Sequence, residues 1–309
     1  MAVPQAQLGV STYEDEVYDR RPLWLRLLTH ARNNPLGTVG LLVVIIMIFA
    51  AIFAPQIAPF DPEENDFAAM FSPPSLTAPE GAAAAHILGT DEFGRDIFSR
   101  IVWGARTAML VGFSCALFAS IGGLLVGVSS AYFGGRVDIF LQRIVDVLIA
   151  FPGIILALAI VAVLGTDLIF VIIAITIPLL PNCARVVRST ALSIREIPYV
   201  DAARACGFGH ARIVLRHMAP NVMAPFLIMM TTFLGQAILA EASLTFLGLG
   251  VQEPTPAWGL MLRSGAEEFA ESAPWVPIFP GLAISLAVFG FNLFGDALRD
   301  ILDPRLRQQ

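Results

Sequence analysis

Residues 41–54 read LLVVIIMIFAAIFA, fourteen apolar residues in a row. They lie inside a longer run, from Leu36 to about Ala58, that contains no ionisable side chain. At 1.5 Å per residue, a helix over this run can cross the roughly 30 Å hydrocarbon layer of a bilayer. The stretch therefore predicts a membrane-spanning helix, and it decides the fold class.

Five further apolar runs of similar length follow along the chain. They cover about 107–133, 139–164, 168–183, 222–249 and 275–294. A helix is the only open-chain way to satisfy every backbone hydrogen-bonding group inside hydrocarbon. We therefore predict an all-α, polytopic membrane protein with six transmembrane helices.

The composition agrees with this interpretation. The chain has 309 residues, of which 56% are hydrophobic and only 14% charged, and its mean hydropathy is +0.73. A soluble domain carries nearer a quarter of charged residues, so a large soluble helical protein is the weaker alternative. A net charge of −6 argues against nucleic-acid binding. The three cysteines match no metal-ligand spacing, and we expect no metal site.

The arginines predict the orientation. All nineteen basic residues are arginines, and fifteen of them lie in the two tails and in the second-to-third and fourth-to-fifth connections. The other four, Arg95, Arg100, Arg106 and Arg263, lie in the remaining loops. Because basic residues concentrate on the cytoplasmic side, we expect both termini in the cytoplasm of a plasma (inner) membrane. An even number of spans, such as six, is then required.

This topology divides the chain into three segments. Residues 1–35 form a cytoplasmic tail, 36–298 the transmembrane domain and 299–309 a second cytoplasmic tail. Within the first tail, residues 22–30 (PLWLRLLTH) predict a short amphipathic helix along the inner interface. The external loops are expected at about 59–106 and 250–274.

The cytoplasmic loop between the fourth and fifth spans, about 186–221, has a helical pattern of its own. Residues 199–209 read YVDAARACGFG. Asp201 suits a helix N-terminus, the alanines leave one face with little side-chain bulk, and Gly207 is a natural stop. Pro220 can open the next helix. Such a helix suits docking in a groove of another protein, and an ordinary surface loop is the alternative.

This pattern resembles the EAA loop of ABC importer permeases. The residues that carry over to ATPase coupling are Asp201, Ala202, Ala203, Arg204, Gly207, Phe208 and Pro220. Asp201 replaces the usual Glu, and the usual Ile-x-Leu-Pro ending reads HMAP at 217–220. The resemblance implies a coupling helix that sits in the cleft of an ATP-binding subunit.

A second resemblance narrows the family. The segments HILGTDEFGRD (86–96), EASLTFLGLG (241–250), PTPAWG (254–259) and FNLFGDALRD (291–300) are similar to those of dipeptide, oligopeptide and nickel permeases. Six spans and a long first external loop match the "C" permease of the pair. The resemblance covers roughly residue 20 to the end, and it implies a permease of the type I ABC importer kind.

The function implied by this resemblance is transport without catalysis by this chain. A homologous second permease would supply the other half of the pathway, two ATP-binding subunits would hydrolyse ATP, and an extracytoplasmic solute-binding protein would deliver di- or oligopeptides. Nickel or another small solute is the alternative cargo. A chain without lysine cannot form a Gly-x-x-x-x-Gly-Lys-Ser/Thr phosphate loop. ATP and Mg²⁺ are therefore expected on the partners, with no cofactor on this chain.

Some charged residues call for separate interpretation. Glu241 is expected at the outer mouth, where it either lines the exit of the pathway or bonds to the glycine-rich turn after it. With Ser243, Asp91 and Arg95 it forms the predicted pathway or external-mouth set.

Arg143 and Asp146 share a helical face and are predicted to form a structural pair in the third span. A proton-coupled secondary transporter is the main rival, and it would need functional charges near the midplane. A membrane-embedded enzyme or a passive channel is a weaker rival. Four glycines of the second span, Gly112, Gly122, Gly123 and Gly127, predict close helix packing there, and a hinge is the second interpretation.

Overall fold

The computed structural model describes residues 34–77, 85–269 and 271–302. Within that part of the chain every regular element is a helix, and the elements from Leu36 onward form one compact unit. The predicted interfacial helix at 22–30 lies outside the described residues, as do residues 303–309 of the predicted C-terminal tail.

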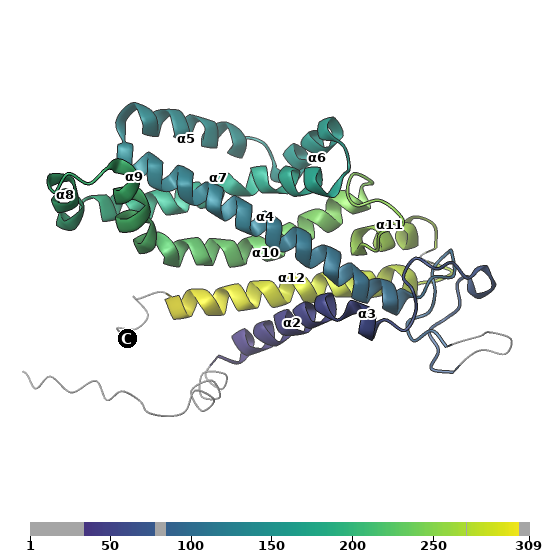
Figure 1. The fold of residues 1–309 in the computed structure, drawn as a ribbon. Coiled ribbons are helices and arrows are strands. Elements are labelled where there is room, and N and C mark those ends of the chain that lie inside the picture. Colours follow the sequence, from purple (N-terminus) through teal and green to yellow (C-terminus); the bar gives the residue numbers. More distant parts are fainter. Residues whose placement is uncertain (1–33, 78–84, 270, 303–309) are drawn as a thin grey trace, which may run out of the picture. The chain divides into compact units, whose positions relative to one another are not determined.

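Among the described residues, five helices are long and apolar enough to cross a membrane (Figure 1). They are α2 (Pro35–Ile52), α4 (Ile97–Phe133), α7 (Leu168–Arg195), the run His210–Phe246 that contains α10 (Met223–Phe246), and α12 (Trp275–Leu302). A sixth crossing arises if the bent pair α5 (Gly135–Ile149) and α6 (Gly153–Leu164) counts as one span. The predicted all-α membrane architecture is confirmed.

Short helical elements connect these spans. They are α3 (Ala54–Ile57), η1 (Phe67–Ala69), α8 (Pro198–Ala205), α9 (His210–Arg212), the π-helix η2 (Ile213–Met218), η3 (Ala219–Val222) and α11 (Trp258–Glu268). In Figure 1, α8 and α9 lie at one end of the long helices and α11 lies at the other end.

The third span differs from the prediction of one continuous helix over 139–164. The chain bends by 90° between α5 and α6. Pro152 explains the break, because proline has no N–H to donate and disfavours helical backbone at the residue before it. Hydropathy alone did not reveal the bend, since the apolar residues of 139–164 continue across the break at Pro152.

Several helices extend beyond the apolar runs that predicted them. Helix α4 begins at Ile97, inside the predicted external loop, because the Asp96 carboxylate accepts hydrogen bonds from both the backbone N–H and the hydroxyl of Ser99, at 2.8 and 2.7 Å. Helices α7 and α12 continue beyond their apolar runs to Arg195 and Leu302, and α11 lies within the predicted loop 250–274. Apolar runs mark the bilayer-crossing part of a helix and leave its polar extensions unmarked.

Glycines bring the long helices into close contact, as predicted for the second span. The most extensive helix pairing joins α4 to α7. A Cβ added to Gly123 would lie 2.4 Å from the Cβ of Cys183, and one on Gly127 would lie 2.7 Å from the carbonyl oxygen of Ala184. Helices α2 and α12 meet in the same way, because a Cβ on Gly290 would lie 2.3 Å from Val43 Cγ1. Backbones can approach this closely only where side chains are absent.

Candidate functional site

Helix α8 is the short helix predicted from the alanine-rich loop. It begins with Pro198 at its first position, where a missing N–H costs nothing. Asp201 lies in the first turn and Arg204 in the last turn, so both charges suit the helix dipole. The Arg204 guanidinium donates to the Asp201 carboxylate across 2.9 Å. The side chains of α8 therefore stabilise the helix from within.

The C-terminus of α8 is a Schellman motif built around Gly207. The N–H of Phe208 donates to the carbonyl of Ala203 at 3.2 Å, and the N–H of Gly207 donates to that of Arg204 at 2.9 Å. Gly207 has φ of +76°, a conformation that favours glycine. The predicted end of the helix at Gly207 is confirmed, and the left-handed backbone of this glycine is its cause.

The two faces of α8 differ. Val200 and Ala203 are buried in the hydrophobic core. The opposite face is exposed and carries Asp201, Ala202, Arg204, Ala205 and Cys206. Three of these five side chains are no larger than a thiol, so another protein could approach the helix backbone closely.

Hydrogen bonds fix this segment to its neighbours. The Tyr199 hydroxyl donates to the carbonyl of His217 at 3.0 Å and accepts from the Asn221 amide at 3.1 Å. Partial burial raises the pKa of Tyr199 above its ordinary value. Tyr132, near the end of α4, shares a 2.8 Å hydrogen bond with His210 Nδ1. Helix α8 and the turn after it are thus tied to η2, to η3 and to α4.

The opposite end of the long helices holds an ionic cluster in which Asp91, Arg95 and Arg100 are buried and Glu253 is exposed. Arg95 Nε donates to Asp91 at 2.7 Å, and Arg95 Nη1 donates to Glu253 at 2.7 Å. Arg100, only 1% exposed, donates to the carbonyl of Pro62 at 3.0 Å. Burial lowers the pKa of Arg95, but the nearby Asp91 and Glu253 carboxylates outweigh it and leave that pKa raised. Burial is also the main cause of the raised pKa of Glu92.

Two residues of the predicted mouth set belong to this cluster. Asp91 and Arg95 are 4% and 5% exposed, so their side chains are not open to a passage. They join the segment before α4 to the loop that carries Glu253, which is a structural task.

The other two residues of that set lie on α10. Glu241 is 1% exposed and accepts a 2.8 Å hydrogen bond from the Thr245 hydroxyl. That hydroxyl in turn accepts from the N–H of Val251 at 3.3 Å. Of the two predicted roles of Glu241, these hydrogen bonds support the local one, because they link its carboxylate through Thr245 to the glycine-rich turn. Ser243 is half-buried, and its hydroxyl donates to the carbonyl of Leu239 at 2.7 Å.

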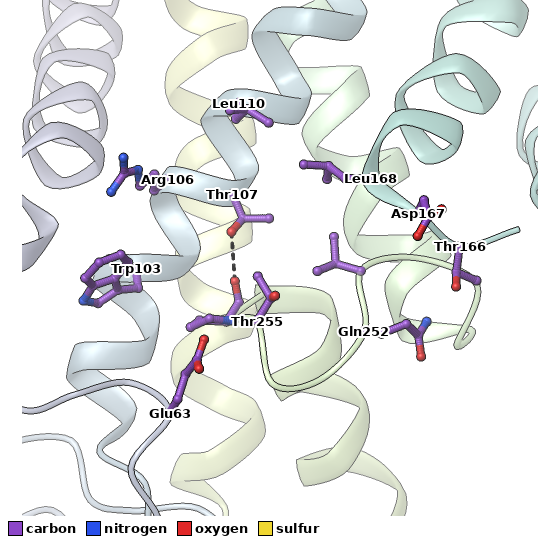
Figure 2. A pocket seen from close by; sticks show the side chains of 12 residues that line it. Glu63, Trp103, Arg106, Thr107, Leu110, Thr166, Asp167, Leu168, Gln252 and Thr255 are labelled. Atoms are coloured by element: carbon purple, nitrogen blue, oxygen red, sulfur yellow. Dashed lines mark hydrogen bonds between the residues drawn. The ribbon is translucent and has the colours of Figure 1, made fainter.

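A pocket of about 490 Å³ lies beside the first turns of α4, at the end of the long helices away from α8 (Figure 2). We call it the outer pocket, after the side on which the sequence predicts this end. Its walls come from α4, from the turn between α6 and α7, and from the segment before α11. Three ionisable side chains line it, Glu63, Arg106 and Asp167. Thr107 donates to the carbonyl of Pro256 across 3.0 Å, which closes one wall. The pocket therefore offers both signs of charge to a solute.

A second pocket of about 240 Å³ lies among α6, α7 and α10. Its lining is mostly apolar or small, as at Gly153, Ala157 and Ala240. Two amide side chains, Asn182 and Gln236, also line it. We call it the middle pocket, because both amides lie near the middle of their helices.

Comparison with known proteins identifies the family. A family described as "binding-protein-dependent transport system inner membrane component" matches residues 123–308. The chain belongs to this family of permeases. A second family, the "N-terminal TM domain of oligopeptide transport permease C", matches residues 23–74. The chain is thus a multi-pass inner membrane permease subunit and not itself an enzyme.

Relatives of the permease cover nearly its whole length. The dipeptide transport system permease protein DppC of Alkalihalophilus pseudofirmus is 44% identical over 92% of this chain and 90% of the relative. The dipeptide permease of Escherichia coli K12 is also 44% identical, over 90% and 91%. The di/tripeptide permease of Pseudomonas aeruginosa is 44% identical over 87% and 88%.

Solved structures share the fold of the permease. A chain of the inward-facing MetNI methionine ABC transporter aligns with a TM-score of 0.53 at 19% identity. The alignment covers 66% of this chain and 96% of that chain. A second crystal form gives 0.54 at the same identity. The predicted importer-like fold is confirmed.

The prediction that Arg143 pairs with Asp146 in the third span named the wrong partner for Asp146. Asp146 accepts a 2.7 Å hydrogen bond from Arg185 of α7 and not from Arg143. Arg188 makes a second bridge between α7 and α5, with two bonds of 2.6 and 2.7 Å to Asp138. Spacing identified the face of α5, but the helix opposite that face supplies the partner.

Sequence reasoning missed the two pockets described above. Arg106 and Asp167 lie near the starts of α4 and α7, and opposite charges near the outer ends of two spans were an available signal. Asn182 and Gln236 were equally visible as amides within apolar runs. The pockets could not be predicted because the sequence does not show which spans lie side by side.

Proposed function

We propose that this permease forms half of the translocation pathway of an ATP-driven peptide importer. A homologous permease supplies the other half, two ATP-binding subunits bind ATP and Mg²⁺, and an extracytoplasmic protein delivers the peptide. Family membership and the three relatives named for dipeptide or di/tripeptide transport support this proposal.

The observation that carries the proposal is the exposed small-residue face of α8. Ala202, Ala205 and Cys206 let a groove of an ATP-binding subunit close on the helix. One end of α8 follows α7 after a short turn, and η2 and η3 join the other side to α10. A displacement of α8 by ATP-driven closure therefore moves α7 and α10 as bodies, which is the alternating-access motion.

The proposed orientation places α8 in the cytoplasm with both termini. The excess of arginines on that side supports it, because cytoplasmic loops carry more basic residues. The outer pocket and α11 then face the extracytoplasmic side, where the binding protein docks.

The outer pocket suits the two charged ends of a peptide. The Arg106 guanidinium can donate two parallel hydrogen bonds to the terminal carboxylate. Asp167 and Glu63 are acceptors for the terminal ammonium group. A pocket of about 490 Å³ has room for a small peptide. The termini are common to all peptides, so this recognition does not depend on side chains.

The test uses the assembled importer, purified with the subunits that co-elute and placed in proteoliposomes with its binding protein. Asp201→Arg puts a cation beside Arg204 on the docking face, whereas Asp201→Glu keeps the charge. We expect Asp201→Arg to lower alanyl-alanine uptake and peptide-stimulated ATPase activity by at least about tenfold, the equivalent of about 1.4 kcal/mol. Asp201→Glu should keep most of both activities.

The same preparation separates the rival functions. Uptake of radioactive nickel without uptake of alanyl-alanine would contradict the peptide assignment. Uptake by this chain alone, driven by a proton gradient, would contradict the dependence on ATPase partners.

A further inference from the structure

Asn182 and Gln236 occupy an unusual position for amide side chains. Asn182 lies in the middle of α7 and Gln236 in the middle of α10, and both are exposed. An amide without a hydrogen-bond partner in hydrocarbon costs several kcal/mol. The surface that they share is therefore turned away from the lipid.

The polar character continues along both helices. Asn182, Arg185 and Ser189 follow one another at helical spacing on the exposed face of α7. On α10, exposed Gln236 lies one turn after Thr232, and Ser243 lies two turns further along the same face; Thr232 and Ser243 are half-buried. Two polar rows that converge on one pocket are typical of a water-containing passage.

We propose that Asn182 and Gln236 bind the peptide backbone midway through the passage. A side-chain amide has one carbonyl acceptor and two N–H donors, which match the N–H and C=O of a peptide bond. The small side chains of Ala157 and Ala240 in the same pocket leave room for different peptide side chains. This inference rests on the proposed peptide transport, and it assigns to the middle pocket a recognition of the peptide bond.

The proposal is tested with a probe that changes the peptide bond alone. Alanyl-lactate has an ester oxygen in place of the peptide N–H of alanyl-alanine, so it cannot donate a hydrogen bond from that position to a side-chain amide carbonyl. Uptake of both compounds is measured in the assembled importer with its binding protein. The binding protein is the same for every permease variant, so its own preference cancels when the uptake ratios are compared.

Three variants and the wild-type importer are compared. Asn182→Leu combined with Gln236→Leu removes both amides, whereas Asn182→Gln combined with Gln236→Asn keeps them. Ser285→Leu is the matched control, because Ser285 is an exposed polar residue of α12 that lines neither pocket described above. The wild-type importer completes the set. Co-purification with the second permease is measured for each variant.

The double leucine variant should lower the ratio of alanyl-alanine to alanyl-lactate uptake by roughly two- to tenfold, the factor of one hydrogen bond. The amide-exchanged variant and Ser285→Leu should keep the wild-type ratio. An unchanged ratio in the double leucine variant would overturn the proposal. Loss of the second permease from that variant would also overturn it, because the amides would then be subunit contacts. A wild-type importer that takes up no alanyl-alanine would instead contradict the proposed function itself.

Discussion

Gly207 is the residue whose backbone conformation matters most in the segment formed by α8 and the turn after it. A Cβ added there would meet no atom within 4 Å, so space does not explain the glycine. Its φ of +76° explains the glycine, because a left-handed conformation costs other residues roughly 1–2 kcal/mol. Gly209 lies two residues further, also in open space, but its φ is −63°. The two glycines form a natural matched pair.

Gly207→Val should unwind the Schellman end of α8 and reduce peptide-stimulated ATPase activity severalfold, because roughly 1–2 kcal/mol of strain falls on the docking helix. Gly209→Ala should leave the activity near the wild-type value. The measurement is ATPase turnover with and without peptide-loaded binding protein, in complexes of equal subunit content. Equal activity in the two variants would show that the left-handed turn has no role in coupling.

At the scale of elements, the permease depends on a close crossing of α4 and α7. Gly123 and Gly127 let the two backbones approach, and two ion pairs to α5 involve Arg185 and Arg188 of the same α7. Helix α7 therefore joins α8 to the core of the molecule. In the proposed mechanism, α7 transmits the displacement of α8 to the passage.

Gly123→Ala should destabilise the permease by about 1–3 kcal/mol, because the new methyl group would lie 2.4 Å from Cys183 Cβ. Gly281→Ala in α12 is the control, since its nearest neighbour, Leu262 Cδ1, is at an ordinary 3.7 Å. That control should be neutral or stabilising by up to about 1 kcal/mol through helix propensity. Thermal unfolding of the purified permease measures both changes. A Gly123→Ala protein as stable as the control would refute the close crossing.

The sequence predicted these elements only in part. Apolar runs located the spans, and the glycines of the second span predicted the close packing. The bend at Pro152 and the extension of α7 to Arg195 were missed, because hydropathy does not record backbone geometry or polar helix ends. Similarly, spacing paired Asp146 with Arg143, whereas the partner on α7 depends on which helices are neighbours in space.

At the scale of the whole molecule, the proposed function assigns roles to three sites along the long helices. Helix α8 receives motion at one end, the middle pocket contacts the peptide backbone, and the outer pocket receives charged peptide ends. The docking helix could be predicted from sequence because its residues are contiguous. The two pockets could not, because Arg106 and Asp167, or Asn182 and Gln236, come from separate helices.

The most direct test of the central claim uses a native residue of the docking face. The chain has three cysteines, of which Cys115 and Cys183 are buried and Cys206 is exposed on the small-residue face of α8. A membrane-impermeant maleimide should label Cys206 in inverted vesicles that lack the ATP-binding subunits. Labelling should be weak in right-side-out vesicles, and assembly with the ATP-binding subunits should protect the thiol. Labelling from the outside, or labelling unaffected by those subunits, would contradict docking of α8 on a cytoplasmic ATPase.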